Sequence, residues 1–240
     1  MDDSNWVDEG DELLNKPELT PAKIPTSPLN PKSAKIQQTL AMVETAFLAS
    51  AGSLIWLINY YFPLGPLFRI FFPLPIALLY LRWGNRAAWM GALVSGLLLT
   101  VLMGPTRSIV FLMPYGFIGV QLGAFWRRNV PWEFSIITGS LLSTFGLFFR
   151  FWLFSILLGE DLWQYITNQM AGFAEWIFLR VGILAQPSST FIQGLVIFTI
   201  FVNSLIYLLS VHLVALLVLD KLGNPIPRPP KWVQIILDYE

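Results

Sequence analysis

The sequence predicts an all-α integral membrane protein with six transmembrane helices and both ends of the bundle on the cytoplasmic side. Of its 240 residues, 55% are hydrophobic and only 12% are charged, whereas soluble domains carry about 25% charged residues. The mean hydropathy is +0.61. The apolar residues form long stretches, and the basic residues gather at one side of them, which together indicate a multi-pass membrane protein.

Six mostly apolar stretches approach the length of about 20 residues that a bilayer requires of a helix. We expect spans at 39–62, 64–81, 87–104, 108–126, 134–158 and 190–219. The second stretch is short and contains Pro66, Pro73 and Pro75, so it is expected to be bent or partly unwound. A bilayer tolerates such a break only where the freed backbone faces protein or a water-filled cavity.

The distribution of basic residues predicts the orientation of the bundle. Only Arg107 and Arg180 lie near one side, while the other side holds Lys32, Lys35, Arg82, Arg86, Arg127, Arg128, Lys221, Arg228 and Lys231. Lys and Arg concentrate in cytoplasmic loops, so both ends are expected in the cytoplasm. An even number of spans requires the same arrangement.

Two tails are expected outside the bundle. Residues 1–35 are acidic at first and then rich in proline, with too little apolar surface to offset the entropy of ordering. They predict a disordered cytoplasmic tail without the features of a signal peptide. Residues 36–222 then form the transmembrane bundle, and the Pro-rich residues 223–240 form a second cytoplasmic tail.

The connection between the fifth and sixth spans, residues 159–189, predicts an amphipathic helix on the outer face. Apolar residues recur at helical spacing from Leu162 to Leu184, and Trp163 and Trp176 suit the level of the lipid headgroups. A helix that covers the bundle and a functional lid are both compatible with this pattern.

Small residues recur at four-residue spacing on several spans, as on helices whose backbones approach closely. On the first span they are Ala41, Thr45, Ala49 and Ser53. Such ladders mostly serve packing within one chain, and less often the binding of a separate subunit.

Four arginines are expected near the outer mouth of the bundle. At 1.5 Å per residue, Arg150 lies about 13 Å and Arg69 about 7 Å below the outer ends of their spans, with Arg107 and Arg180 near the same mouth. A charge deep in a helix costs at least about 2.5 kcal/mol, so Arg150 requires a partner or water. The sequence predicts a cavity in which Arg69, Arg107, Arg150 and Arg180 bind an anionic solute, with Asn203 also lining it.

Internal pairing is the alternative for Arg150. Its partners would be Glu160, Asp161, Glu175 or carbonyls freed by the broken second span. At the inner level, Glu44 and His212 lie about 9 Å and about 10 Å from the ends of their spans, which predicts a structural pair. A proton relay is less favoured, because about 14 Å with few ionisable groups separates the two levels.

The residue inventory argues against catalysis, cofactors and metals. One histidine and no cysteine exclude Cys–His nucleophiles and histidine-rich metal sites. A Gly-rich phosphate loop, an HExxH motif and a nucleophile elbow are all missing. Fifteen basic and fifteen acidic residues balance, so bulk charge does not favour a nucleic-acid partner.

The stretch "LPIALLYLRWGNRAAWMGALVSGLLL" joins a proline-containing span, a basic turn and a span rich in small residues. With six expected spans and the small-residue face of the first span, it resembles the DUF2232/YybS-like membrane proteins over about residues 36–222. These are similar to the substrate-binding S components of energy-coupling-factor (ECF) transporters. The resemblance implies that Ala41, Thr45, Ala49 and Ser53 dock on a transmembrane coupling subunit, and that the ligand pocket opens outward. Glu44, within a turn of that face, and the long outer connection depart from the pattern.

The sequence therefore predicts a membrane protein that binds a small anionic solute from the outer side of the bilayer. The alternative is a non-transporting membrane scaffold or assembly factor of the DUF2232 type, which the Pro-rich tails favour. The lipid bilayer is the expected environment, either the cell (inner) membrane or an internal photosynthetic or organellar membrane.

Overall fold

The computed structural model describes residues 31–62, 65–182, 187–230 and 233–234. Residues 38–240 form one compact unit and residues 1–37 a separate one. The predicted disordered tail at 1–35 lies mostly outside the described residues, and within it residues 31–35 are helical.

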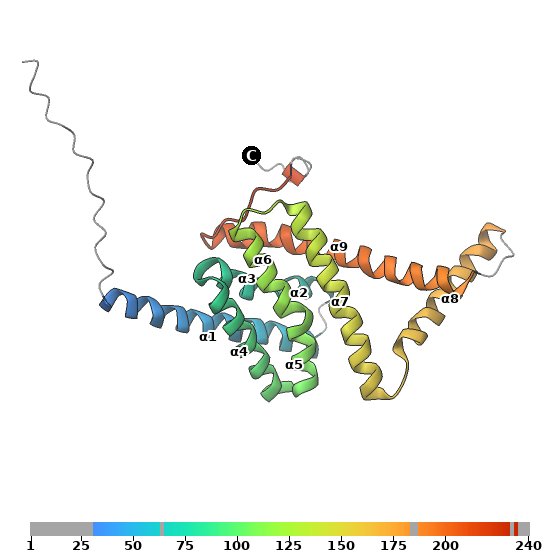
Figure 1. Cartoon of the computed structure of the whole chain (residues 1–240), viewed down its shortest axis with the longest axis horizontal. Coiled ribbons are helices and arrows are strands. Elements are labelled where there is room, and N and C mark those ends of the chain that lie inside the picture. The colour runs from blue at the N-terminus through green and yellow to red at the C-terminus, as the bar shows by residue number, and fades with distance from the viewer. Residues whose placement is uncertain (1–30, 63–64, 183–186, 231–232, 235–240) are drawn as a thin grey trace, which may run out of the picture. The chain divides into compact units, whose positions relative to one another are not determined.

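The described residues of the compact unit form helices joined by short turns, and no strand occurs among them (Figure 1). In chain order the elements are α1 (Pro31–Tyr61), α2 (Pro66–Ile70), α3 (Leu74–Trp83), α4 (Asn85–Met103), α5 (Pro105–Phe111), the π-helical turn η2 (Leu112–Gly116), α6 (Phe117–Arg127), α7 (Trp132–Leu158), α8 (Leu162–Val181) and α9 (Ser189–Lys221).

Five helical stretches of the described chain are long and apolar enough to cross a membrane. They are Lys35–Tyr61, Asn85–Met103, Pro105–Arg127, Trp132–Leu158 and Ser189–Lys221. Each coincides with one of the six spans expected from the sequence, which confirms five of them as helices of the required length.

The expected second span is divided into the short helices α2 and α3. In the turn between them, N–H groups donate to carbonyls three residues earlier in the chain. Phe72 N–H donates to the Arg69 carbonyl and Leu74 N–H donates to the Phe71 carbonyl, both at 3.2 Å. Pro73 has no N–H for a regular helical bond. The predicted bend is confirmed, while neither piece alone is long enough to be a span.

Positive φ angles at two glycines reverse the chain at both ends of α4. Gly84 has φ 83° and Gly104 has φ 89°, a region that side chains with a Cβ rarely adopt. A Cβ on Gly84 would also lie 2.7 Å from a guanidinium nitrogen of Arg127. These turns place α3, α4 and α5 next to one another in space, in agreement with the contacts between them.

The short helix α3 lies at the centre of the bundle. Its residues from Leu74 to Leu79 are all buried. On one side it joins a core with Trp126, Trp132 and Leu208, and on the other a core with Ala92, Leu99 and Phe111. A helix enclosed on all sides is expected to be apolar all round. This explains why the sequence of α3 resembles part of a membrane span although the helix is short.

Glycines allow α3 to pack closely on α6. A Cβ on Gly119 would lie 2.8 Å from the Pro73 carbonyl oxygen, and one on Gly123 would lie 2.9 Å from that of Ala77. Ordinary side chains at these positions would push the helices apart, so small residues here permit the contact.

The ladder of small residues on α1 is used for packing within the chain. Thr45, Ala49 and Ser53 are buried. The Ser53 hydroxyl donates to the Ser95 carbonyl of α4 at 3.1 Å, and the Ser95 hydroxyl donates to the Ala49 carbonyl at 3.0 Å. The expected docking face is thus covered by α4, and Ala41 alone of its four residues is partly exposed.

Helices α7 and α9 pack along part of their lengths and then separate (Figure 1). Ser135 bonds to His212 at 3.1 Å, and Thr144 bonds to Ser204 at 3.3 Å. Beyond the Thr144–Ser204 bond the helices diverge, and Figure 1 shows α8 joining their far ends. We call the part of the molecule where α7 and α9 diverge, beyond Thr144 and Ser204, the α7–α9 fork.

Helix α8 is the helix expected between the fifth and sixth spans. Asp161 caps it by accepting 3.0 Å bonds from the N–H groups of Trp163 and Gln164. Trp163 contacts Phe148 of α7, and Phe178 contacts Phe191 of α9. Only Ala174 of α8 is buried, so α8 bridges two helices and leaves most of its apolar surface uncovered.

The described part of the expected C-terminal tail packs on the bundle. Trp132 donates its indole N–H to the Pro227 carbonyl at 2.9 Å. Ile226 and Val233 are buried in the same core as Trp132. The compact fold therefore continues past residue 222, where the sequence placed the end of the bundle.

Candidate functional site

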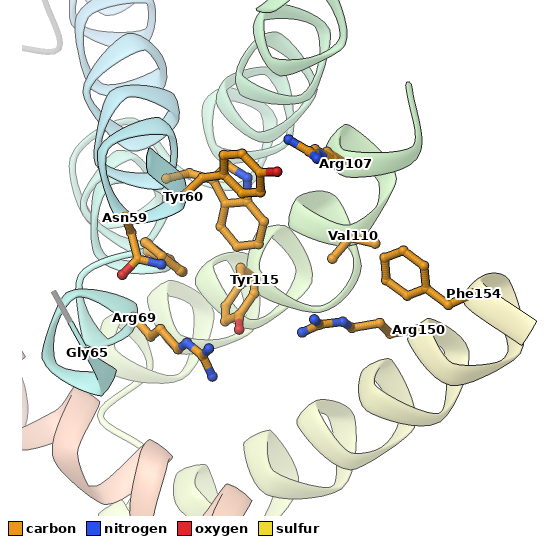
Figure 2. A pocket seen from close by; sticks show the side chains of 11 residues that line it. Asn59, Tyr60, Gly65, Arg69, Arg107, Val110, Tyr115, Arg150 and Phe154 are labelled. Carbon is orange, nitrogen blue, oxygen red and sulfur yellow. The ribbon is translucent and has the colours of Figure 1, made fainter. Parts of the chain in front are cut away.

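Three of the four arginines expected at the outer mouth line one cavity. It has a volume of about 500 Å³, and Arg69 of α2, Arg107 of α5 and Arg150 of α7 contribute to its wall. Asn59 and Tyr60, near the end of α1, also line it. Figure 2 shows the Arg69 and Arg150 side chains pointing into the same space from separate helices, with the Tyr115 hydroxyl between them.

Two of the three guanidinium groups lie near aromatic rings, and none of the three has a carboxylate partner among the described residues. The guanidinium carbon of Arg107 lies 3.8 Å from the centre of the Tyr60 ring, and that of Arg150 lies 5.7 Å from the centre of the Phe154 ring. In the described part of the chain none of the three guanidiniums makes a hydrogen bond, and the ion pair found there joins Arg82 to Glu44. The internal partners considered for Arg150 are therefore not used.

This arrangement concentrates positive charge that the described protein groups do not neutralise. A guanidinium within a transmembrane segment is costly unless water or an anion solvates it. Its planar fork of donors matches the oxygens of carboxylate and phosphate groups. The size and charge of the cavity therefore suit an anion with two or more oxygens.

A second cavity of about 220 Å³ shares a wall with the first. Arg69, Tyr115 and Arg150 line both cavities. The second cavity lies where α7 and α9 begin to separate, because Ser204, at the base of the α7–α9 fork, lines it. Its remaining lining is mixed and consists of Ile70, Ser143, Leu147, Asn203, Ile206, Tyr207 and Ser210. Asn203, expected at the site, thus belongs to this second space.

Aromatic residues that the sequence did not single out form the inner wall of the first cavity. The Trp56 ring lies 4.9 Å from that of Phe72 and 5.5 Å from that of Tyr115, centre to centre. The indole N–H of Trp56 is buried without an acceptor among the described groups. These aromatics stand in aliphatic stretches, and no spacing in the sequence distinguishes them from ordinary core residues.

Arg180 is not brought together with the other arginines. It lies in the last turn of α8, with its guanidinium carbon 5.4 Å from the centre of the Trp176 ring. It is not among the residues that line either cavity. The sequence placed it near the mouth because it lies in the connection between the fifth and sixth spans, but that does not specify where the last turn of α8 lies.

Glu44 and His212 do not pair as expected. Glu44 accepts a 3.1 Å bond from Arg82 and a 2.7 Å bond from the indole N–H of Trp83. His212 is fully buried, with one ring nitrogen 2.8 Å from the Leu208 carbonyl and the other 3.1 Å from the Ser135 hydroxyl. The equal depths estimated for the two residues were not sufficient, because each finds a nearer partner on α3 or α7.

Comparison with known proteins gives one family match. A family model described as a predicted membrane protein (DUF2232) matches residues 51–237. The match includes every residue that lines the two cavities, and it continues into the C-terminal segment that packs on Trp132. Neither a curated protein nor a solved structure matches the chain.

Proposed function

The chain belongs to the DUF2232 family of predicted membrane proteins, and from this premise we propose that it binds a small anionic solute from the outer side of the bilayer. The observation that carries the proposal is the cavity in which Arg69, Arg107 and Arg150 converge with no carboxylate partner in the part of the chain that the structure describes. Its volume falls within the range of ordinary small-molecule sites.

The contacts at the two ends of α2 and α3 support six crossings of the membrane. Arg69 of α2 lines the cavity together with Tyr60, at the end of α1. At the other end, Arg82 of α3 bonds to Glu44, in the first half of α1, and to the carbonyl of Leu222, just after α9. The pair α2–α3 therefore runs back along α1, which with the five long helices gives six passes.

The distribution of charge supports an outward-facing cavity. Arg82, Arg127 and Lys221 lie at the end of the bundle away from the cavity. Because basic residues concentrate on the cytoplasmic side, that end is assigned to the cytoplasm. The cavity then opens to the outside, where it can take up a solute.

The proposal is limited to solute binding. In ECF S components the small-residue face of the first helix docks on a coupling subunit, but here α4 covers Thr45, Ala49 and Ser53. A coupling subunit would need another surface. The alternative of a scaffold rested partly on a free C-terminal tail, and the described part of that tail packs on its own bundle.

Anion binding can be measured on the full chain purified in a neutral detergent. We expect phosphate, pyrophosphate, glycerol 3-phosphate or a dicarboxylate to raise the melting temperature in a saturable manner. Arg69→Gln and Arg150→Gln should each weaken that binding about tenfold or more, because a hydrogen bond to a charged group contributes about 1.5–3 kcal/mol.

Arg180→Gln is the matched control, since it removes a guanidinium that does not line the cavity. It should bind as the wild type does. The proposal fails if the wild type binds none of these anions or their phospholipid forms, or if the three variants lose affinity equally.

A further inference from the structure

We infer that the anion is the phosphate headgroup of a membrane lipid, which reaches the arginines sideways through the α7–α9 fork. This inference deepens the proposed function and rests on it. It follows from the position of the second cavity, from the apolar surface of the fork and from the charge of the shared wall.

The second cavity connects the arginines to the side of the bundle. It lies at the base of the fork, next to the Thr144–Ser204 bond, and shares Arg69 and Arg150 with the first cavity. Leu147 of α7 and Asn203 of α9, each just beyond the Thr144–Ser204 bond, line it from opposite sides of the fork. A molecule lying between α7 and α9 would therefore have one end next to the guanidinium groups of Arg69 and Arg150.

The three helices around the fork carry exposed apolar surface. Large apolar side chains are exposed on all three helices that bound it: Trp152, Ile156 and Leu157 on α7, Phe173 and Ile177 on α8, and Phe191, Ile197 and Phe198 on α9. A further hollow of about 620 Å³ lies where α7 meets α8, and it has an aromatic side with Phe148, Phe151, Trp152 and Trp163 and a polar side with Ser155, Glu160 and Asp161. Hydrocarbon chains gain from contact with such surface, whereas a fully polar solute does not.

The charge of the shared wall selects among lipid headgroups. Arg69 and Arg150 lie on it and Arg107 is nearby, so the site presents three positive charges that have no counter-ion within the described chain. A phosphate monoester carries nearly two negative charges at neutral pH and accepts bidentate bonds from guanidinium groups. A zwitterionic headgroup brings its own cation next to these arginines and is disfavoured.

The experiment compares ligands that share a headgroup or share their tails. The full chain in neutral detergent is titrated with glycerol 3-phosphate, with phosphatidic acid in mixed micelles and with phosphatidylcholine of the same acyl chains. We expect phosphatidic acid to bind at least tenfold more tightly than either of the others. Arg69→Gln and Arg150→Gln should abolish this preference.

Variants of the second cavity distinguish the binding of a lipid from the binding of a free phosphate compound. Leu147→Trp and Ile206→Trp narrow the second cavity and should weaken phosphatidic acid about tenfold, while glycerol 3-phosphate binding changes less than twofold. Leu141→Trp makes the same change at an exposed position of α7 that lines neither cavity, so it should leave both ligands unaffected. Unchanged melting temperatures would show that the variants are folded.

Each outcome bears on one of the two proposals. If glycerol 3-phosphate binds as tightly as phosphatidic acid, the inference is overturned and the proposed function stands. Equal affinity for phosphatidylcholine and phosphatidic acid would also overturn it, since the headgroup would then not affect binding. Should no ligand depend on Arg69 or Arg150, both proposals are wrong.

Discussion

Hydroxyl groups inside the bundle bond mostly to a carbonyl one helical turn before them. Thr45 donates to Ala41, Ser53 to Ala49, and Thr100 to Gly96. Hydrocarbon offers no hydrogen-bond partner, so a polar side chain must be satisfied within the protein. Bonds between helices are fewer, and the one between Ser135 and His212 satisfies a fully buried ring.

Replacing Ser135 therefore tests a bond that joins two helices. Ser135→Ala leaves one ring nitrogen of His212 without its partner and should destabilise the protein by about 0.5–1.5 kcal/mol, in the range of bonds between transmembrane helices. Thr100→Ala also removes a hydroxyl, but one that bonds within its own helix. Thermal unfolding in a mild detergent should show the larger loss for Ser135→Ala, and equal losses would contradict the assignment.

The arginine site shows what the sequence can predict about single residues. Counting 1.5 Å per residue placed Arg69 and Arg150 both in the outer half of their spans, and these two line a common cavity with Arg107. The same counting was wrong for Glu44 and His212, because depth does not specify the direction in which a side chain points. Trp56 and Tyr115 could not be predicted, since their role depends on which helices are neighbours.

The contact between α3 and α6 depends on glycine more than on any apolar side chain. Gly123→Ala would place a methyl group against Tyr80 and 2.9 Å from the Ala77 carbonyl oxygen. Overpacking of this kind costs typically about 1–3 kcal/mol, so we expect a lower melting temperature in detergent. Gly194→Ala in α9 meets nothing within 4 Å and should leave stability nearly unchanged. Similar losses in the two variants would contradict the packing account, because the gain in helix propensity from Gly→Ala is common to both and only Gly123 faces a close neighbour.

Elements that span the membrane were easier to predict than elements that do not. A long apolar stretch has few alternatives in a bilayer, and the prolines at 73 and 75 indicated the break before α3. Helix α8 was expected from its periodicity, but periodicity says which face is apolar and not what covers it. The sequence therefore could not decide between a helix that covers the bundle and a lid, and in the structure most of the apolar face of α8 is exposed.

The number of crossings can be tested on the whole molecule, because the natural sequence contains no cysteine. Phe62→Cys follows α1 and Arg86→Cys follows α3, and both positions are exposed. If α2 and α3 cross the bilayer together, a membrane-impermeant thiol reagent should label these two variants from opposite sides. Glu160→Cys, after α7, should be labelled from the same side as Phe62→Cys. Labelling of Phe62→Cys and Arg86→Cys from one side would mean five crossings.

At the scale of the whole molecule, composition and apolar length predicted the fold class and the main helices. The last long helix ends at Lys221, but the packing of Ile226 and Val233 beside Trp132 was not foreseen, because a segment with several prolines resembles a tail. Trp132 and Pro227 are 95 positions apart in the sequence, and no local pattern reveals that they meet. The DUF2232 match to residue 237 agrees with a fold that includes this segment.

The enclosure of Trp132 by Ile226 and Val233 has a consequence for biosynthesis. Membrane helices are inserted in order as the ribosome makes them, and early segments can pack only with what has already emerged. The core around Trp132 therefore stays incompletely packed until Val233 has left the ribosomal tunnel. Final closure of the bundle is an event that follows the insertion of its last helix.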